Sequence, residues 1–211
     1  MGSSDLNYLK AVVIVHGKSE RQICEFIKSK LKLNIHVESD RGGRKSIQIT
    51  SVMNTLKNTQ YNTQDSFIKT FPAVELVESE DCSKGKKGKK KKKSKLQISS
   101  NFRIFIIMDV DDCTEVEKKE FINKDMFKEH WAYEHIVPIY NEINLEDAMV
   151  SCGIKFKKMG NARKEEYIKI FPTDPKYQKK DTVQIEEFHD MLLRCKKTNM
   201  DEFTKFCISI S

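Results

Sequence analysis

The chain has 211 residues, a net charge of +7 and 38% hydrophobic residues, which is enough for one α/β domain with a core of its own. No apolar run reaches the roughly 20 residues of a membrane span, and the first residues, 1–5, lack the basic and apolar regions of a secretory signal. We therefore expect no membrane association. Six cysteines without a CxxC pair (24, 82, 113, 152, 195 and 207) predict reduced thiols in a cytoplasmic protein, with no disulfide framework or zinc site.

Residues 11–15 are apolar throughout and predict a strand that is buried on both faces. The polar stretch 16–20 follows, and Ser19 is the expected N-cap of a helix over about 20–31, with Gln22 completing a capping box. Alternation over 33–37 predicts a second strand, and a helix from Ser46 to about Lys57 is expected after a glycine turn. These spacings predict a right-handed parallel βαβ unit.

The next segment interrupts this pattern. Residues 67–77 are moderately apolar and begin like a helix. Nine lysines lie between Lys84 and Lys95, and without them the remaining net charge would be −2, so the basic character belongs to this one run. Because like charges repel and the run has nothing to bury, we expect residues 79–98 to be disordered. The run would either attract nucleic acid in a salt-sensitive way or be a merely solvated insertion.

Residues 102–108 form a second run that is apolar apart from Arg103 and predict another strand buried on both faces; the run ends in Asp109, Asp111 and Asp112. If strand geometry persists, Asp109 and Asp111 point to the same side of the sheet. Two carboxylates held so close repel each other unless a cation lies between them, and Mg²⁺ takes oxygen ligands. The alternative is that Asp111 and Asp112 cap the following helix; of the two, Asp112 is the better candidate for a cap.

The remaining elements follow from the same patterns. A polar helix is expected over about 115–129, then a strand over 135–140, which Pro138 places at an edge of the sheet. A helix begins at Leu145, and helical segments are expected over 183–194 and 200–207. We therefore predict an α/β domain over residues 1–153 and a helical extension packed on it over 154–211.

Three strand ends carry chemical groups: His16 to Glu20, Asp109 to Asp112, and an acidic cluster at Glu142, Glu146 and Asp147. In a parallel sheet these ends share one edge. In order and strand context the sequence resembles the Toprim family of topoisomerases, primases and nucleases of the overcoming-lysogenization-defect type. The first family motif corresponds to Val15-His16-Gly17-Lys18-Ser19-Glu20, and the Asp-x-Asp motif to Asp109-Val110-Asp111. The resemblance covers about residues 10–152.

The resemblance implies a Rossmann-like Toprim fold, with a mostly parallel four-stranded sheet flanked by helices. It also implies a nuclease dependent on Mg²⁺ or Mn²⁺ that acts on DNA or RNA, at family level often as an effector in bacterial antiviral defence, within a larger complex. The metal ligands would be Asp109, Asp111, Glu20 and Glu146, and the catalytic residues His16, Glu20, Asp109 and Asp111. Lys18, Ser19, Arg44 and Lys45 are the candidate phosphate-binding residues.

One departure from the family pattern bears on catalysis. His16 stands where the family has its catalytic glutamate. A histidine titrates near neutrality and can replace a general acid or base, and a neutral imidazole suits Mn²⁺ better than Mg²⁺. The alternatives are a repurposed, non-catalytic module that binds nucleic acid or a partner protein, and a histidine held at a strand end by a backbone hydrogen bond.

Two further interpretations concern phosphate binding. Gly17-Lys18-Ser19 is similar to the end of a nucleotide-binding P-loop, but Val12 occupies the position of the required glycine, which argues against an NTPase. The stretch Gly42-Gly43-Arg44-Lys45 either cradles a nucleic-acid phosphate or is an ordinary surface turn.

Overall fold

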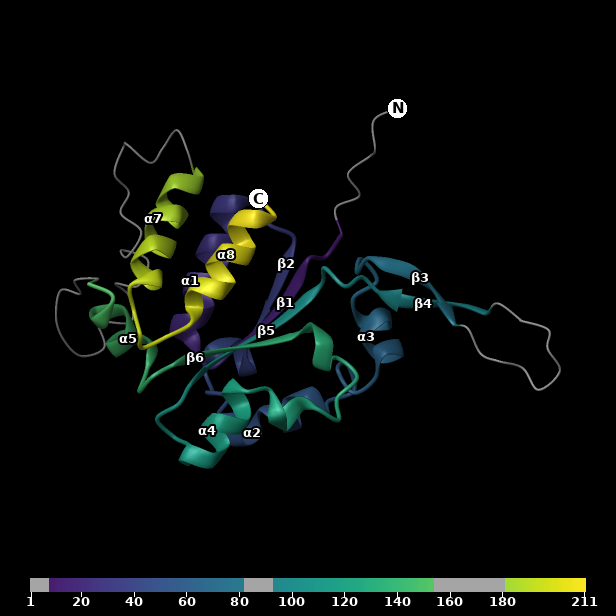
Figure 1. The fold of residues 1–211 in the computed structure, drawn as a ribbon, viewed down its shortest axis with the longest axis horizontal. Coiled ribbons are helices and arrows are strands. Elements are labelled where there is room, and N and C mark those ends of the chain that lie inside the picture. Colours follow the sequence, from purple (N-terminus) through teal and green to yellow (C-terminus); the bar gives the residue numbers. More distant parts are fainter. Residues whose placement is uncertain (1–7, 82–92, 154–180) are drawn as a thin grey trace.

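The computed structural model describes residues 8–81, 93–153 and 181–211 (Figure 1). Its centre is a four-stranded, fully parallel sheet with the order β2-β1-β5-β6. The strands are β1 (Ala11–Val15), β2 (Ile35–Glu38), β5 (Arg103–Asp109) and β6 (Ile136–Asn141). This arrangement confirms the prediction of an α/β fold with a parallel sheet flanked by helices, and it is consistent with a Rossmann-like fold.

Helices cover both faces of this sheet. The α-helices are α1 (Lys18–Leu31), α2 (Ile49–Leu56), α3 (Gln64–Thr70), α4 (Glu115–Ile122), α5 (Leu145–Ser151), α7 (Asp181–Leu193) and α8 (Met200–Ser209). The short 3₁₀ helices in the described part of the chain are η1 (Asp40–Gly43), η2 (Asp125–Phe127) and η3 (Tyr133–His135). In Figure 1, α1, α7 and α8 lie on one side of the sheet and α2 and α4 on the other. None of the described helices is long and apolar enough to cross a membrane.

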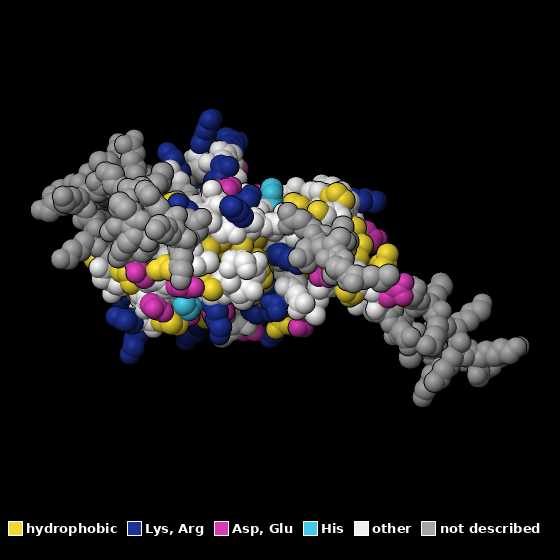
Figure 2. Space-filling view, turned by 90° about the horizontal axis from the view of Figure 1, so that it is seen from above, with side chains coloured by type: hydrophobic (Ala, Val, Ile, Leu, Met, Phe, Trp, Pro, Cys, Tyr) yellow, Lys and Arg dark blue, Asp and Glu magenta, His cyan; other side chains and the backbone are white. Residues whose placement is uncertain are grey.

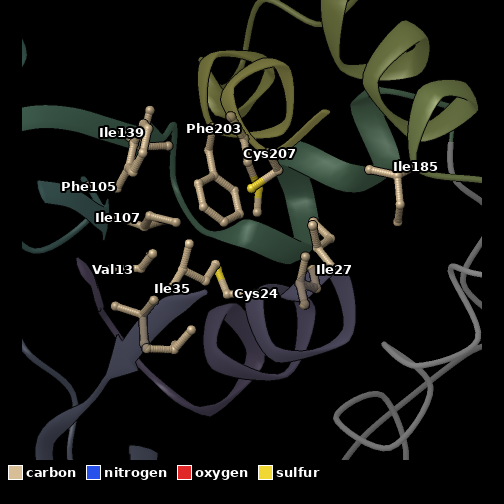
Figure 3. Packing of buried hydrophobic residues seen from close by; sticks show 14 of the residues in the cluster. Val13, Cys24, Ile27, Ile35, Phe105, Ile107, Ile139, Ile185, Phe203 and Cys207 are labelled. Carbon is tan, nitrogen blue, oxygen red and sulfur yellow. The ribbon is translucent and has the colours of Figure 1, made fainter. Parts of the chain in front are cut away.

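The two central strands are apolar because both of their faces are buried. All five residues of β1 are completely buried, and their side chains alternate between the two helical layers. Val13 packs with Cys24 of α1 and with Phe203 and Cys207 of α8 in one cluster, part of which is drawn in Figure 3. Val12 belongs to the cluster on the opposite face. The C-terminal helix α8 thus completes one layer of the main core.

The edge position of β6 is confirmed. Within the described sheet, β6 pairs only with β5, so the missing N–H of Pro138 breaks no ladder. Asn199, which precedes α8, binds this edge: its side-chain amide donates to the Pro138 carbonyl at 3.1 Å, and its Oδ1 accepts from the Tyr140 N–H at 2.8 Å. The C-terminal segment therefore satisfies the exposed edge of the sheet.

The prediction of a disordered segment over 79–98 is wrong at both ends. Strand β3 (Leu76–Asp81) pairs antiparallel with β4 (Lys93–Ile98) and forms a ribbon that extends away from the main sheet in Figure 1. The register runs from Leu76 opposite Ile98 to Asp81 opposite Lys93. Most of the lysine run falls in 82–92, outside the described residues.

Two helix boundaries also differ from prediction. Gly17, not Ser19, is the N-cap of α1, and the Glu20 carboxylate accepts the Gly17 N–H at 3.0 Å. Helix α4 ends at Ile122 instead of continuing to about 129. It begins after Thr114, whose hydroxyl accepts the Glu117 N–H at 3.3 Å, so Asp112 is not its cap. The helices expected over 183–194 and 200–207 are confirmed as α7 and α8, whereas 154–180 lie outside the described residues.

Candidate functional site

The strand order reverses between β1 and β5. From β1 the chain moves to β2 on one side, and β5 and β6 later add to the other side. In open parallel sheets, ligands bind beyond the carboxyl ends of the strands at such a switch point. His16 directly follows β1 and Asp109 ends β5, and the His16 N–H donates to the Ile107 carbonyl at 2.8 Å. The fold therefore brings together the two residues on which the sequence prediction depends.

The His16 ring is held in one orientation by Ile47, in the loop before α2. Nδ1 lies 2.8 Å from the Ile47 carbonyl oxygen, and the Ile47 N–H donates to the His16 carbonyl at 2.8 Å. Because a carbonyl only accepts hydrogen bonds, Nδ1 carries the proton in this contact. Nε2 is the remaining nitrogen and lies 3.8 Å from Asp109 Oδ2, too far for a direct hydrogen bond. It is thus available to bind a proton, a water molecule or a metal ion.

Asp109 is a buried carboxylate with only partial compensation. Its side chain is 8% exposed, and Oδ1 accepts one hydrogen bond from Asn141 Nδ2 at 3.0 Å. Burial, followed by the nearby charge of Glu20, raises its pKa from 3.8 to about 7, although Asn141 and His16 act in the opposite direction. A carboxylate in this position would be stabilised by added positive charge.

Glu20 is the second buried carboxylate of the site. It is 2% exposed, and its hydrogen bond to the Gly17 N–H fixes it at the first turn of α1. A Cβ added to Gly17 would lie 3.4 Å from Glu20 Oε2, so the carboxylate lies directly against the backbone that follows β1. The charge of Glu20 raises the pKa of Asp109, so the two carboxylates interact electrostatically.

The other predicted carboxylates lie outside this buried pair. Strand β5 ends at Asp109, so strand alternation does not extend to Asp111, which is exposed and is the weakest of the influences that raise the pKa of Asp109. Asp112 accepts a hydrogen bond from Gln48 Nε2 at 3.0 Å. Asp111 is close enough to act electrostatically, but it shares no buried face with Asp109.

In the third acidic cluster, the side chains of Glu142 and Asp147 bind neighbouring residues. Glu142 binds Lys197 at 2.5 Å and Lys118 at 3.7 Å, and these contacts lower its pKa. Asp147 accepts from the Asn144 side chain at 2.9 Å at the start of α5. Glu146 is half-buried, and in the described part of the chain no hydrogen bond or ion pair connects it with Asp109 or His16. The structure therefore leaves Glu146 separate from the His16–Asp109 pair.

The candidate phosphate-binding residues meet at the start of α1. Gly43 has a φ of +82°, and a Cβ at this position would lie 2.8 Å from Lys18 Cα, so the glycine turn packs directly on the first turn of the helix. Lys18, Arg44 and Lys45 are exposed, whereas Ser19 is buried. Lys45 forms one ion pair, with Asp40 at 3.8 Å.

Charge alone does not locate a nucleic-acid interface. In the view of Figure 2, Lys and Arg side chains occur at several separate places and do not gather in one patch. A hollow of about 540 Å³ lies along β2 and the residue that follows it, and neither His16 nor Asp109 lines it. Its walls include the guanidinium of Arg21, the rings of His36 and Phe71, the carboxylate of Glu38 and the amide of Gln60.

The side chains of Asp109, Glu20 and His16 fit a divalent cation that is held partly by the substrate better than a cation that is held by the protein alone. Among the described residues, no group of three or more His, Cys, Asp or Glu side chains is arranged to hold a metal ion. Mg²⁺ is often bound by only one or two carboxylates, with water and substrate phosphates completing its shell. The two buried acids Asp109 and Glu20, of which Glu20 raises the pKa of Asp109, fit that mode, and His16 Nε2 adds a nitrogen that Mn²⁺ accepts readily.

Sequence reasoning missed the residues that hold Asp109. Asn141 is completely buried at the end of β6, and its Oδ1 accepts from Thr198 Oγ1 at 2.9 Å. Asn141 could have been found by the same argument as Asp109, because it too is a polar residue that ends an apolar strand. Thr198 carries no comparable signal, since it lies in the loop before α8 and reaches the site only through tertiary structure.

Comparisons of the chain with protein-family models, with curated proteins and with solved structures found no match. The resemblance to the Toprim family therefore remains a prediction from the motifs themselves.

Proposed function

We propose that this protein is a divalent-metal-dependent nuclease that hydrolyses phosphodiester bonds of DNA or RNA at the crevice between β1 and β5. The observation that carries the proposal is the convergence of His16 Nε2 and two buried carboxylates, Asp109 and Glu20, at the point where the strand order reverses. Ligands bind at such points in parallel sheets, and buried acids with raised pKa values are frequent in active sites.

Asp109 and Glu20 are the proposed primary metal ligands, because they are buried and close enough to interact. Asp111 would act from the exposed rim, and Glu146 is the least supported of the predicted ligands, since the described contacts do not join it to Asp109. A bound Mg²⁺ or Mn²⁺ would supply Lewis acidity for the phosphate and lower the pKa of a coordinated water.

His16 is the proposed general acid–base. Its Nδ1–H is committed to the Ile47 carbonyl, which leaves Nε2 to take up or release a proton at the crevice. His16 would thereby transfer protons at the position where the Toprim family, which this sequence resembles, has a glutamate. Lys18, Arg44 and Lys45, exposed beside the same helix terminus, would bind phosphates that flank the scissile bond. A role as an effector in a larger antiviral complex remains a further expectation from the resemblance.

The test is cleavage of DNA and RNA by the purified protein with Mn²⁺ or Mg²⁺. Asp109→Asn should abolish cleavage, whereas Asp112→Asn, which changes an exposed acid outside the buried pair, should preserve it. Cleavage that persists in pure Asp109→Asn protein would show that the site lies elsewhere.

A second candidate function is a non-catalytic module that binds nucleic acid or a partner. The absence of a described three-residue metal group favours it, together with the histidine at the glutamate position. His16→Glu separates the two candidates. Loss of an existing activity would assign His16 a catalytic role, whereas a gain of metal-dependent cleavage would indicate an enzyme site that had lost its glutamate.

A further inference from the structure

Two cysteine thiols from distant parts of the chain bind the same backbone oxygen. Cys152, at the end of α5, donates to the Ala148 carbonyl at 3.1 Å, and Cys195, just after α7, contacts the same oxygen at 3.6 Å. The Ser151 hydroxyl lies 3.1 Å from the Cys195 sulfur. The Cys195 side chain also hydrogen-bonds that of Cys152 and contributes, after burial, to raising the pKa of Cys152. The two sulfur atoms are therefore neighbours.

Other described cysteines do not offer the same combination of proximity and access. Cys24 and Cys207 are completely buried in the core between α1 and α8 (Figure 3), where an oxidant in water does not reach them. Cys113 is half-buried, and its thiol donates to the Val110 carbonyl at 3.6 Å. Cys152 and Cys195 are both partly exposed, which is a condition for thiol oxidation in the folded protein.

The surroundings of Cys152 favour its role as the second, resolving thiol. Burial, followed by the Cys195 side chain, raises its pKa, so it forms the nucleophilic thiolate less readily than an unperturbed cysteine does. Its thiol is also held by the Ala148 carbonyl, to which it donates at 3.1 Å. Cys195 is therefore assigned as the first thiol to react.

We propose that Cys152 and Cys195 form a reversible disulfide when the folded protein meets a hydroperoxide. The Cys195 thiolate attacks one peroxide oxygen, the O–O bond breaks, and the products are a Cys195 sulfenic acid and one water after protonation. The Cys152 sulfur then attacks the Cys195 sulfur and releases the second water. In total the two thiols lose two electrons and two protons, and hydrogen peroxide is reduced to two molecules of water.

The proposed bond would tie α5 to the loop that supports Asp109. This loop, 194–199, is paired with the end of β6: the Glu142 N–H donates to the Lys197 carbonyl at 2.7 Å, and Thr198 donates to Asn141. Asn141 in turn donates to Asp109. Cys195 is therefore only three residues from Thr198, whose hydroxyl orients Asn141, the hydrogen-bond partner of Asp109. The disulfide itself does not depend on the proposed nuclease activity.

The experiment uses the full chain, reduced, treated with increasing hydrogen peroxide, alkylated and mapped without reduction. The expected product is one peptide pair joined through Cys152 and Cys195, lighter by two hydrogen atoms and separated again by dithiothreitol. Cys113→Ser should leave this product unchanged, whereas Cys152→Ser and Cys195→Ser should each abolish it. Oxidised wild-type protein should also melt at a higher temperature than reduced protein, because the bond closes a long loop in the unfolded chain.

Mapping of the wild-type protein alone decides the proposal, so a variant that fails to fold does not leave it open. Alkylation of both Cys152 and Cys195 at peroxide concentrations that link other cysteines, Cys82 included, would overturn it. A link between two chains through either residue would overturn it as well.

Discussion

Replacement of Asp109 by asparagine should make the protein more stable at alkaline pH while abolishing the proposed activity. The pKa of Asp109 is raised from 3.8 to about 7, so between these values the folded state keeps a proton that the unfolded chain has released. Folding stability therefore falls as the pH rises through this range, and above pH 7 the ionised carboxylate costs the folded state about 4 kcal/mol. Below pH 3.8 both states are protonated, and the cost disappears.

Asparagine can keep the contacts of Asp109 without carrying its negative charge. Its Oδ1 can accept from Asn141, as Asp109 does at 3.0 Å, and its amide can face His16 Nε2, which lies 3.8 Å from the present Oδ2. Because the cost in the wild type grows with pH, the stability advantage of Asp109→Asn should increase by about 2 to 3 kcal/mol between pH 5 and pH 8. Urea unfolding of both proteins at the two pH values measures this difference, and titrating groups that do not interact with Asp109 cancel in the comparison.

Asp112→Asn is the matched control, since the same substitution on an exposed acid should change stability by less than about 0.5 kcal/mol at either pH. Addition of Mn²⁺ at pH 8 should stabilise the wild type and leave Asp109→Asn unchanged. An advantage of Asp109→Asn that is absent at pH 8, or that does not grow with pH, would refute the claim that Asp109 is an undercompensated buried charge.

Three further predictions concern the surroundings of the site. Thr198→Val removes the donor to the buried Asn141 oxygen and should cost about 1 to 3 kcal/mol in urea unfolding; Thr198→Ser should restore most of this loss, and equal losses would show that packing matters more than the hydroxyl. Gly43→Ala should destabilise by about 1 to 3 kcal/mol, because alanine would need a positive φ and a Cβ only 2.8 Å from Lys18 Cα. The double variant Arg44→Ala and Lys45→Ala should weaken nucleic-acid binding and reduce the slope of log K against log salt by about 1 per lost phosphate contact; an unchanged slope would place the phosphate contacts elsewhere.

The strands were predictable because burial dictates their composition. A strand covered on both faces is apolar along nearly its whole length, which is why 11–15 and, apart from Arg103 at its start, 102–108 were recognised. Pro138 similarly allows only an edge or an irregular position. The proximity of His16 and Asp109 followed from the geometry of parallel sheets, in which the carboxyl ends of neighbouring strands meet.

Other features depend on contacts between distant segments and could not be predicted. The end of β5 at Asp109 rather than beyond it separates Asp109 from Asp111, and no local pattern marks that end. Strand β4 begins within the lysine run and pairs with β3 from another segment of the chain, a backbone pairing that the composition of the run does not indicate. Local composition describes the charge of a segment, but not the strand with which it pairs.

The C-terminal helices are therefore better regarded as part of the candidate site than as an attachment to it. Phe203 and Cys207 of α8 complete the core beneath β5, and Thr198, just before α8, holds Asn141, which holds Asp109. A buried acid needs fixed hydrogen-bond partners to stay oriented while its charge remains uncompensated. Since the hydroxyl that orients Asn141, the hydrogen-bond partner of Asp109, comes from residues 194–199, a chain truncated after Gly153 should lose the orientation of Asp109 even if β1 and β5 still paired. Activity at this sheet edge would thus depend on a segment that contributes none of the predicted catalytic residues.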